Sequence, residues 1–398
     1  MKINQLKIAA VGAVAVAGLT AACGTAQQAP ASEPGRGTVV SVTPVADLAP
    51  AEVTARLRAA GIDAAQVRFG VSAQRVVYRT IGTNGEPTTA SQLVAFPRNE
   101  RSDLSVVSWL HGTTVYRGDV ASVKEESTDR AAALLFASTG QAVSAPDYLG
   151  LGEGPGTHPY GHPEATVSAA LDALRAARDV ASGQGRTFDE RVRVSGFSQG
   201  GPATMMFGRA LRDGADPAFS LGGLAPIAGP FHLSRFEAAA AEDKIDKAAL
   251  YLAYFATAWD RMYGLYDSPS QAFRAPYDAQ VETLFDGEHQ TGEIATALPP
   301  VAKDLFTEQF LAEVRNPAGV LRDRLRPLDT TCDWKPEVPV HLFHAAGDRD
   351  VDFANSEHCR GQLLAHGAEP RLTDVGAVDH NGSVRVALPQ VAREFTPA

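Results

Sequence analysis

Short apolar runs alternate with stretches of helical periodicity along most of this chain. Most of the apolar runs end in Gly or Asp, and they read LSVVSWLHG, QAVSAPD, RVRVSG, LGGLAPIAG and VPVHLFHAAGD. Alternation of this kind predicts a mostly parallel sheet that is covered by helices on both faces. Ligand-binding and catalytic groups are then expected at the carboxyl ends of the strands.

The residues before this alternation predict a helix and a hairpin. The stretch APAEVTARLRAAGI has a short helical pattern, and QRVVYRTIGTNGEPTTASQLVAFP reads as two strands joined at Asn84-Gly85. That dipeptide is typical of tight hairpin turns. Together with the alternating runs, these elements predict a core formed by residues 49–230 and 336–398.

The alternation breaks between residues 231 and 335. Helical patterns such as IDKAALYLAYFATAWDRMYGLY and PPVAKDLFTEQFLAEVRN fill this stretch. It is too long for a bare loop in a compact domain, so we interpret it as a helical cap inserted into the core. Its aromatic side chains either line an apolar substrate cleft or pack the cap itself; they are Tyr251, Tyr254, Phe255, Trp259, Tyr263 and Tyr266.

The first residues have the pattern of an export signal. A basic start at Lys2 and Lys7 precedes an apolar run over residues 8–19 that is too short to span a bilayer comfortably. Cys23 then follows two alanines, which is similar to the lipobox of bacterial lipoproteins. This resemblance implies cleavage before Cys23 and a lipid on its sulfur.

We therefore assign residues 1–22 to a signal peptide, and residues 23–48 to the lipidated cysteine and a flexible tether. The segment GTAQQAPASEPGRGT is rich in small and polar residues, Pro and Gly, as flexible linkers are. The alternative is a plainly cleaved signal peptide. Export is expected in both cases, either as a membrane-anchored lipoprotein of the cell envelope or as a secreted protein.

Composition and charge narrow the classes of partner. The chain has 398 residues, of which 44% are hydrophobic and 21% charged, and a formal net charge of -10 at pH 7. An acidic surface argues against nucleic acid or anionic phosphates as partners. No CxxC motif or His/Cys cluster suggests a metal site.

Two cysteines remain after the signal region, Cys332 and Cys359. An exported protein meets an oxidising compartment, where an even pair of cysteines is typically oxidised. We expect a disulfide between them.

The stretch VRVSGFSQGGPATMMFGRALRD predicts a strand that turns at once into a helix. Such a turn has almost no room for side chains, and glycines stand two residues before and two residues after Ser198. In this arrangement the serine hydroxyl is exposed at the end of the strand, which is the position of a nucleophile. The alternative is a glycine-rich turn with a solvated serine.

A serine nucleophile needs a base, and the base needs an orienting acid. His380 follows a strand-like run and sits in a polar, glycine-containing stretch that we interpret as a loop. His358 and His366 fall in a helical pattern, so surface or cap positions are expected for them.

The acid is expected among three aspartates of AAGDRDVDFANS, which are Asp348, Asp350 and Asp352. Asp348 directly follows the apolar run and is the preferred candidate. Asp350 could face the site if the strand runs longer, and Asp352 suits the N-terminus of the next helix.

The oxyanion of the reaction needs fixed hydrogen-bond donors. The run SWLHGTT ends a strand, and its glycine lets backbone approach a substrate closely. We expect the backbone amides of Thr113 and Gln199 to form this oxyanion hole, and His111 to be buried and structural.

The motifs HGTT, APDYLGLGEG, HPYGHPEATVSAALDALRAAR, GFSQGG, HAAGDRDVDFANS and DHNG occur in this order. They resemble the α/β-hydrolase fold and, within it, the secretory lipase and esterase family of bacteria and fungi, over about residues 65–395. The resemblance implies a central mostly parallel sheet with an inserted cap, and an acid at the position of Asp348. It also implies that Asp147 and Tyr148 shape the neighbourhood of the nucleophile, mainly as structural residues.

The sequence therefore predicts a serine hydrolase that cleaves a small-molecule or lipid ester without a cofactor. Catalysis is assigned to Ser198, His380 and Asp348. A serine aminopeptidase on the same fold is the first alternative, and Glu237 or Glu242 in the cap could bind its substrate's amine. A non-catalytic surface lipoprotein that binds a ligand in the cleft is the second.

Overall fold

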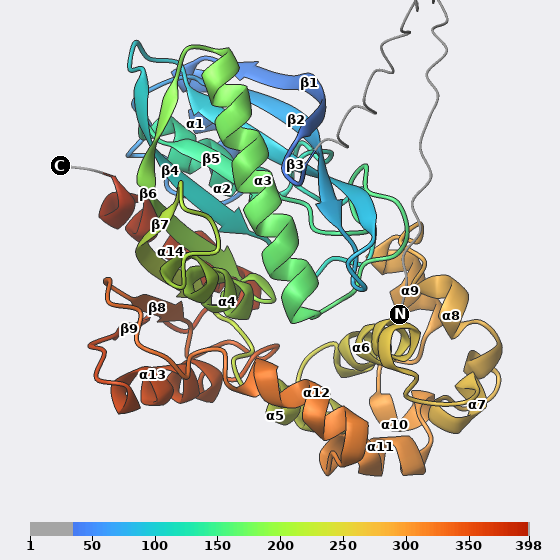
Figure 1. The fold of residues 1–398 in the computed structure, drawn as a ribbon. Coiled ribbons are helices and arrows are strands. Elements are labelled where there is room, and N and C mark those ends of the chain that lie inside the picture. The colour runs from blue at the N-terminus through green and yellow to red at the C-terminus, as the bar shows by residue number, and fades with distance from the viewer. Residues whose placement is uncertain (1–34, 397–398) are drawn as a thin grey trace, which may run out of the picture. The chain divides into compact units, whose positions relative to one another are not determined.

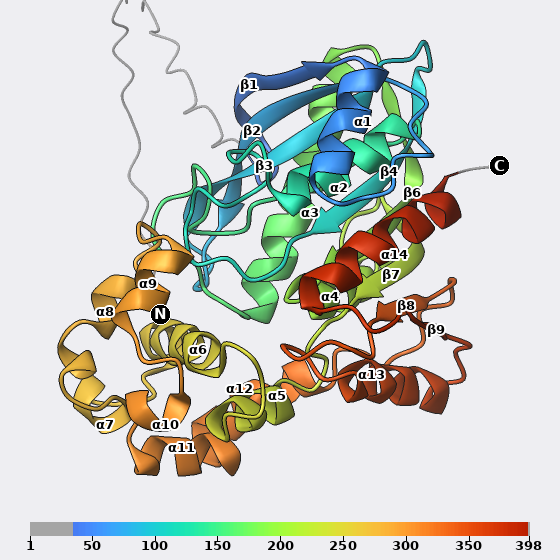
Figure 2. The ribbon, with the colours of Figure 1, turned by 180° about the vertical axis from the view of Figure 1, so that it is seen from behind.

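The computed structural model describes residues 35–396, and in this part of the chain a nine-stranded sheet lies between two layers of helices (Figures 1 and 2). The strand order is β1-β2-β3-β5-β4-β6-β7-β8-β9. The strands are β1 (Val39–Leu48), β2 (Val71–Ile81), β3 (Pro87–Pro97), β4 (Asp103–Leu110), β5 (Ala142–Pro146), β6 (Thr187–Phe197), β7 (Ser220–Ile227), β8 (His341–His344) and β9 (Arg371–Asp374).

The six strands from β5 to β9 in this spatial order pair in parallel, whereas β1, β2, β3 and β5 pair antiparallel in turn. The carboxyl ends of the parallel strands consequently meet at one edge of the sheet. The hairpin predicted at Asn84-Gly85 is present between β2 and β3, and Gly85 has the positive φ of 83° that such a turn requires.

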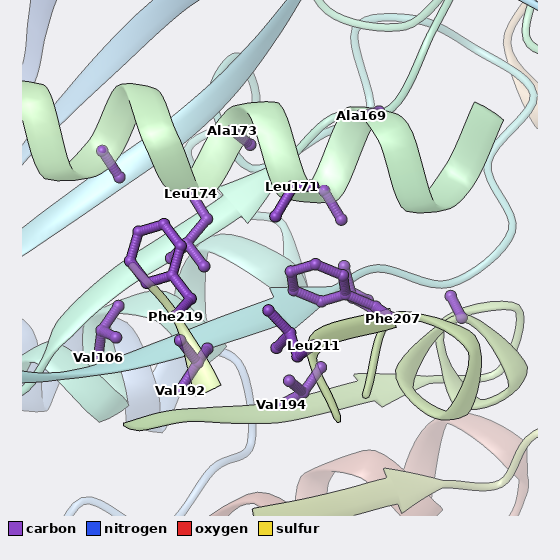
Figure 3. Close-up of a cluster of buried hydrophobic side chains, with 14 of the residues drawn as sticks. Val106, Ala169, Leu171, Ala173, Leu174, Val192, Val194, Phe207, Leu211 and Phe219 are labelled. Atoms are coloured by element: carbon purple, nitrogen blue, oxygen red, sulfur yellow. The ribbon is translucent and has the colours of Figure 1, made fainter. Parts of the chain in front are cut away.

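Each face of the sheet has its own apolar core. Helices α3 (Pro163–Gly183), α4 (Gly200–Arg212) and α13 (Ala354–Ala365) cover one face, and α1 (Pro50–Ala59), α2 (Thr128–Ser138) and α14 (His380–Phe395) cover the other. Figure 3 shows α3 and α4 packed on β6 through Leu171, Leu174, Phe207, Leu211, Val192 and Val194. Successive residues of a strand face opposite sides, so Val194 lies in this core and Phe197 in the other.

The regular elements between β7 and β8 are helices. They are α5 (Leu233–Ala241), α6 (Ala248–Tyr263), α7 (Pro269–Ala272), a 3-10 turn (Tyr277–Ala279), α8 (Val281–Leu284), α9 (Thr291–Ala297), α10 (Ala302–Leu305), α11 (Glu308–Arg315) and α12 (Gly319–Asp329). We call residues 231–335 the cap segment. A separate buried apolar cluster that includes Phe255, Trp259 and Phe306 holds it together.

The expectation of a flexible tether up to residue 48 is wrong for its last part. Residues 39–48 form β1, which pairs antiparallel with β2 along its whole length, for example Val42 with Val76. The linker composition extends only over residues 24–38, whereas the strand itself, VVSVTPVADL, is rich in the β-branched residues that favour strands. The predicted signal peptide, Cys23 and the start of the tether lie outside the described residues.

Cys332 and Cys359 form the expected disulfide, with their Cα atoms 5.2 Å apart. The bond joins the end of the cap segment to α13. Among the described helices, none is long and apolar enough to cross a bilayer.

Candidate active site

Ser198 lies in the turn between β6 and α4, where the sequence places it. Its φ of 55° is in the left-handed region, which a residue other than glycine rarely adopts. The flanking glycines make this turn possible: a Cβ at Gly196 would lie 2.4 Å from the Gly200 carbonyl oxygen, and one at Gly200 would lie 2.0 Å from that of Leu110. The backbone amide of Ser198 donates a 2.9 Å hydrogen bond to the Ile227 carbonyl, which fixes the turn against β7.

Three side chains that are far apart in the sequence meet at the carboxyl edge of the parallel strands. The Ser198 hydroxyl donates to His380 Nε2 over 2.9 Å, and His380 Nδ1 donates to Asp348 Oδ2 over 2.6 Å. The carboxylate can only accept, so the proton of a neutral His380 is on Nδ1 and Nε2 is free to accept from the serine. All three residues are buried.

His380 is the first residue of α14 and does not lie in a loop as expected. Asp379 ends the preceding loop and its carboxylate accepts from the backbone amide of Gly382, which caps the helix. The rings of Phe197 and His380 are in contact, with centroids 4.6 Å apart. The helix start and this ring contact fix the imidazole beside Ser198.

Asp348 lies four residues beyond the end of β8, in a tight loop that satisfies its carboxylate with several donors. The backbone amides of Asp350 and Val351 donate to Oδ1 over 3.0 and 2.9 Å. His380 and His344 both face Oδ2, and Nε2 of His344 is 3.2 Å away. Burial alone would raise the pKa of Asp348, but the hydrogen bonds from His344 and His380 hold this pKa well below its usual range.

The structure brings neither of the other two aspartates to His380. The Asp350 carboxylate accepts from Lys247 and from the Tyr251 hydroxyl of α6. Asp352 accepts a 2.8 Å hydrogen bond from the backbone amide of Ala354 at the start of α13. This is the helix N-terminal position that the sequence suggested for Asp352.

The loop after β4 passes close to Ser198. A Cβ at Gly112 would lie 3.1 Å from a ring carbon of Phe197 and 3.4 Å from Ser198 Cβ, so a side chain there would fit only if its neighbours shifted slightly. Thr113 lines the same cleft as Ser198. Within the described residues, no hydrogen bond occupies the backbone amide of Thr113 or Gln199.

His158 fixes the side chain of Gln199, a role that the sequence analysis missed. His158 Nδ1 donates to the Leu149 carbonyl over 2.9 Å, so its Nε2 accepts from the Gln199 amide nitrogen over 3.0 Å. Burial lowers the pKa of His158 to about 3, which keeps this ring neutral. His158 belongs to the run HPYGHPE, but the groups that it bonds to lie in other parts of the chain, so the run alone does not indicate its role.

His111 is buried and lies beside the site without touching the serine. Its ring nitrogens are 2.7 Å from the Gly112 carbonyl oxygen and 3.1 Å from that of Asp147. The carboxylate of Asp147 accepts from the hydroxyls of Ser91 and Ser122, both over 2.6 Å. These contacts hold together the loops that surround Ser198.

Four of the six cap aromatics contact the site region. Tyr251 lines the cleft with Ser198, and the Tyr254 hydroxyl donates to the Thr114 carbonyl over 3.1 Å. Phe255 and Trp259 line a small apolar cavity that Gln199 also lines. The other two lie elsewhere: Tyr263 stacks on His162, and Tyr266 donates to Glu282.

The two cap carboxylates considered for amine binding do not line the cleft that contains Ser198. Glu237 is 1% exposed, and within the described residues neither of its oxygens has a hydrogen-bond partner. Burial raises the pKa of Glu237 well above its usual value, so a neutral carboxyl is expected there. The hydrogen bond and charge of Lys244 lower the pKa of the Glu242 carboxyl.

The comparisons with known proteins agree with this fold. The model of the secretory lipase family matches residues 124–225. No curated protein matches the chain at a significant level.

Solved structures cover most of the chain. A provisionally assigned hydrolase from Legionella pneumophila is 25% identical, with a TM-score of 0.82, and the match covers 90% of this chain and 97% of that one. LipA from Xanthomonas oryzae, a rice cell wall degrading esterase, is 27% identical, with a TM-score of 0.80 and coverages of 91% and 97%. Candida antarctica lipase A is 15% identical, with a TM-score of 0.64 and coverages of 92% and 84%, and shows the fold alone.

The protein therefore has the α/β-hydrolase fold. The family match and the esterase neighbour group it with the carboxylic ester hydrolases of the lipase and esterase type.

Proposed function

We propose that the protein is an exported serine esterase that cleaves carboxylic esters through an acyl-enzyme intermediate. The observation that supports this proposal best is the hydrogen-bonded series from Ser198 through His380 to Asp348 at the carboxyl edge of the sheet. A solvated serine in a glycine-rich turn would not need a buried imidazole and carboxylate behind it. The series also argues against a non-catalytic binding protein.

The arrangement supplies each proton transfer of ester hydrolysis. Ser198 Oγ attacks the carbonyl carbon of the ester while His380 Nε2 takes the hydroxyl proton. The same nitrogen then gives the proton to the leaving alkoxide, so that an alcohol departs and an acyl-serine remains. Water attacks this ester in the second half, with His380 again as the base, and releases the carboxylic acid. Asp348 stays ionised and stabilises the imidazolium in both halves.

The oxyanion of each tetrahedral intermediate is assigned to the backbone amides of Thr113 and Gln199. Both amides are unoccupied within the described residues, and Gln199 precedes α4, whose N-terminus favours negative charge. A donor of this kind contributes about 10²- to 10³-fold to the rate.

Neither Glu237 nor Glu242 lines the cleft with Ser198, although the carboxyl groups of Asp119, Glu126 and Asp129 do. The choice between esters and peptides with a free amine therefore depends on the kinetic comparison described below. A small cavity of about 30 Å³ beside Gln199 is lined largely by apolar side chains such as Met206, Leu233 and Phe255. A small-molecule or lipid ester is the proposed substrate class.

Export is supported by the resemblance to a family described as secretory, and a lipid on Cys23 is proposed from the sequence. Mass spectrometry of the exported protein should find a diacylglyceryl-modified cysteine at the new N-terminus. Cys23→Ser should release the protein to the medium. A wild-type protein that is soluble and begins at another residue would contradict the proposed lipid anchor. It would leave the esterase proposal unaffected.

The decisive test is turnover of p-nitrophenyl esters of rising chain length beside amino-acyl p-nitroanilides. We expect hydrolysis of the esters, and loss of about 10⁴- to 10⁶-fold in rate in Ser198→Ala. Ser195→Ala, three residues earlier on β6, is the matched control, because its hydroxyl only donates to the Ala225 carbonyl. A folded Ser198→Ala enzyme that retains turnover would overturn the mechanism, and faster cleavage of the anilides would favour the aminopeptidase.

A further inference from the structure

A second histidine faces the carboxylate that orients His380. His344 is the last residue of β8 and is fully buried. Its Nε2 lies 3.2 Å from Asp348 Oδ2, the same oxygen that accepts from His380 Nδ1 over 2.6 Å. Two imidazoles therefore approach one carboxylate oxygen, that of His344 from strand β8 and that of His380 from the start of helix α14.

The neighbours of His344 determine which of its nitrogens carries a hydrogen. Nε2 is 2.9 Å from the Val351 carbonyl oxygen as well as 3.2 Å from Asp348 Oδ2, and both groups can only accept. Nδ1 is 2.7 Å from the hydroxyl of Ser356, which can donate to it. Nε2 must consequently be protonated whether the ring is neutral or charged. Its N–H donates to the Val351 carbonyl, and Asp348 Oδ2 lies 3.2 Å from the same nitrogen as a second, electrostatic contact.

We infer that His344 is a positioning residue, which acts on catalysis through Asp348 by holding Oδ2 in place and withdrawing part of its negative charge. This inference rests on the proposed function, because it concerns the acid of the proposed catalytic series. Two backbone amides of the loop hold Oδ1 of Asp348, whereas Oδ2 faces the two histidines, His380 and His344. The low pKa of Asp348 agrees with this role, since the hydrogen bond from His344 is among its causes.

Loss of this donor has two expected consequences. A less restrained carboxylate orients His380 less well, which lowers kcat and leaves substrate binding unchanged. A carboxylate that no longer shares its charge with His344 stabilises the imidazolium of His380 more strongly, so the acid limb of the pH profile moves to higher pH.

The experiment compares two amides at position 344. In His344→Gln the side-chain amide can reach toward Asp348 and donate as Nε2 does, whereas in His344→Asn it is too short and can only face Ser356. We expect kcat of His344→Asn to fall about 10- to 100-fold, with KM within about twofold and the acid limb higher by about half a pH unit. His344→Gln should keep most of the wild-type kcat and pH profile.

His341→Phe is the matched control, because His341 lies on the same strand and is buried but bonds to Glu394 and Thr373 instead. It should keep the wild-type pH profile. The inference is overturned if a folded His344→Asn has the wild-type kcat and acid limb, or if His341→Phe shows the same changes. His344→Phe replaces the Asn variant if the smaller side chain prevents folding.

A measurement on the wild-type protein tests the tautomer of His344 on which the inference depends. Long-range ¹H–¹⁵N correlation of the histidine rings should show a protonated Nε2 in His344, and an unprotonated Nε2 would overturn it. The activities of the wild type and of Ser198→Ala distinguish failure of the inference about His344 from failure of the proposed function. Retained activity of Ser198→Ala overturns the esterase mechanism, whereas an inactive Ser198→Ala with unaffected His344 variants overturns the role of His344 alone.

Discussion

The carboxylate of Asp350 accepts a 2.8 Å hydrogen bond from the hydroxyl of Tyr251, and this bond joins the loop of the proposed acid to the cap segment. Lys247 donates to the same carboxylate oxygen. The Tyr251 ring lines the cleft that contains Ser198. Two aspartates separated by one residue thus have different partners: Asp348 faces the His380 imidazole, and Asp350 holds a cap side chain beside Ser198.

The first prediction separates these two aspartates. Asp348→Asn should lower kcat about 10⁴-fold, because an amide in place of the carboxylate favours the wrong tautomer of His380. Asp350→Asn should keep kcat within about tenfold of the wild type and raise KM, since Tyr251 loses a charged partner. Steady-state kinetics on a p-nitrophenyl ester measure both.

Asp352→Asn serves as the control and should mainly lower the melting temperature, as its carboxylate contacts only the start of α13. A near-normal Asp348→Asn enzyme beside an inactive Asp350→Asn enzyme would show that the acid has been assigned to the wrong residue.

The turn that contains Ser198 could be predicted because the glycines that indicate it lie next to it in the sequence. Gly196 and Gly200 are required by clashes with backbone that lies within a few residues or on the adjacent strand β4. The order of the proposed acid and base after Ser198 also follows the chain. The start of α14 at His380 is not apparent from the sequence, because Asp379, whose carboxylate caps the helix, stands in a polar, glycine-containing run.

Features that depend on distant partners could not be read from the sequence. The role of Asp350 requires Lys247 and Tyr251, which are about a hundred residues away. His344 and His158 likewise acquire their contacts only when separate loops come together.

The second prediction concerns His158. In His158→Phe the ring can still stack on Tyr148, but the acceptor for the Gln199 side chain is lost. If Gln199 supplies an oxyanion donor, kcat and kcat/KM should fall together by about tenfold, because that interaction exists mainly in the transition state.

His162→Asn is the control from the same sequence run. His162 caps α3 by accepting from the Ala165 amide, and asparagine can replace it there. We expect unchanged kinetics in this variant. A His158→Phe enzyme whose KM rises while kcat is unchanged would argue that Gln199 contributes to substrate binding instead.

The third prediction concerns the disulfide between Cys332 and Cys359, which are separated by 27 residues in the sequence. Closing a loop of this length is expected to contribute about 3 kcal/mol to the free energy of unfolding. The double variant Cys332→Ser/Cys359→Ser should unfold at lower denaturant concentration and keep its activity at 25 °C. Urea titrations with and without reductant measure this difference, and two free thiols in non-reducing peptide maps of the wild type would contradict it.

The fourth prediction concerns the buried carboxyl of Glu237 and the pH dependence of stability. Burial raises its pKa in the folded state well above the unfolded value of about 4.3. Between these two pKa values the folded protein binds one proton more than the unfolded chain, so stability falls as pH rises, by about 1.4 kcal/mol per pH unit. Below the unfolded pKa both states are protonated and this loss disappears.

Glu237→Gln resembles the protonated acid in shape and cannot ionise. We expect it to be more stable than the wild type at pH 7 to 8 and equally stable near pH 4, in urea titrations repeated at intervals of one pH unit. Glu190→Gln, at an exposed glutamate, is the control and should leave the pH dependence of the wild type unchanged. A Glu237→Gln protein that is less stable than the wild type at pH 7 would mean that Glu237 is ionised and paired in the folded protein. Its pKa would then not be raised, and the slope attributed to it would have another source.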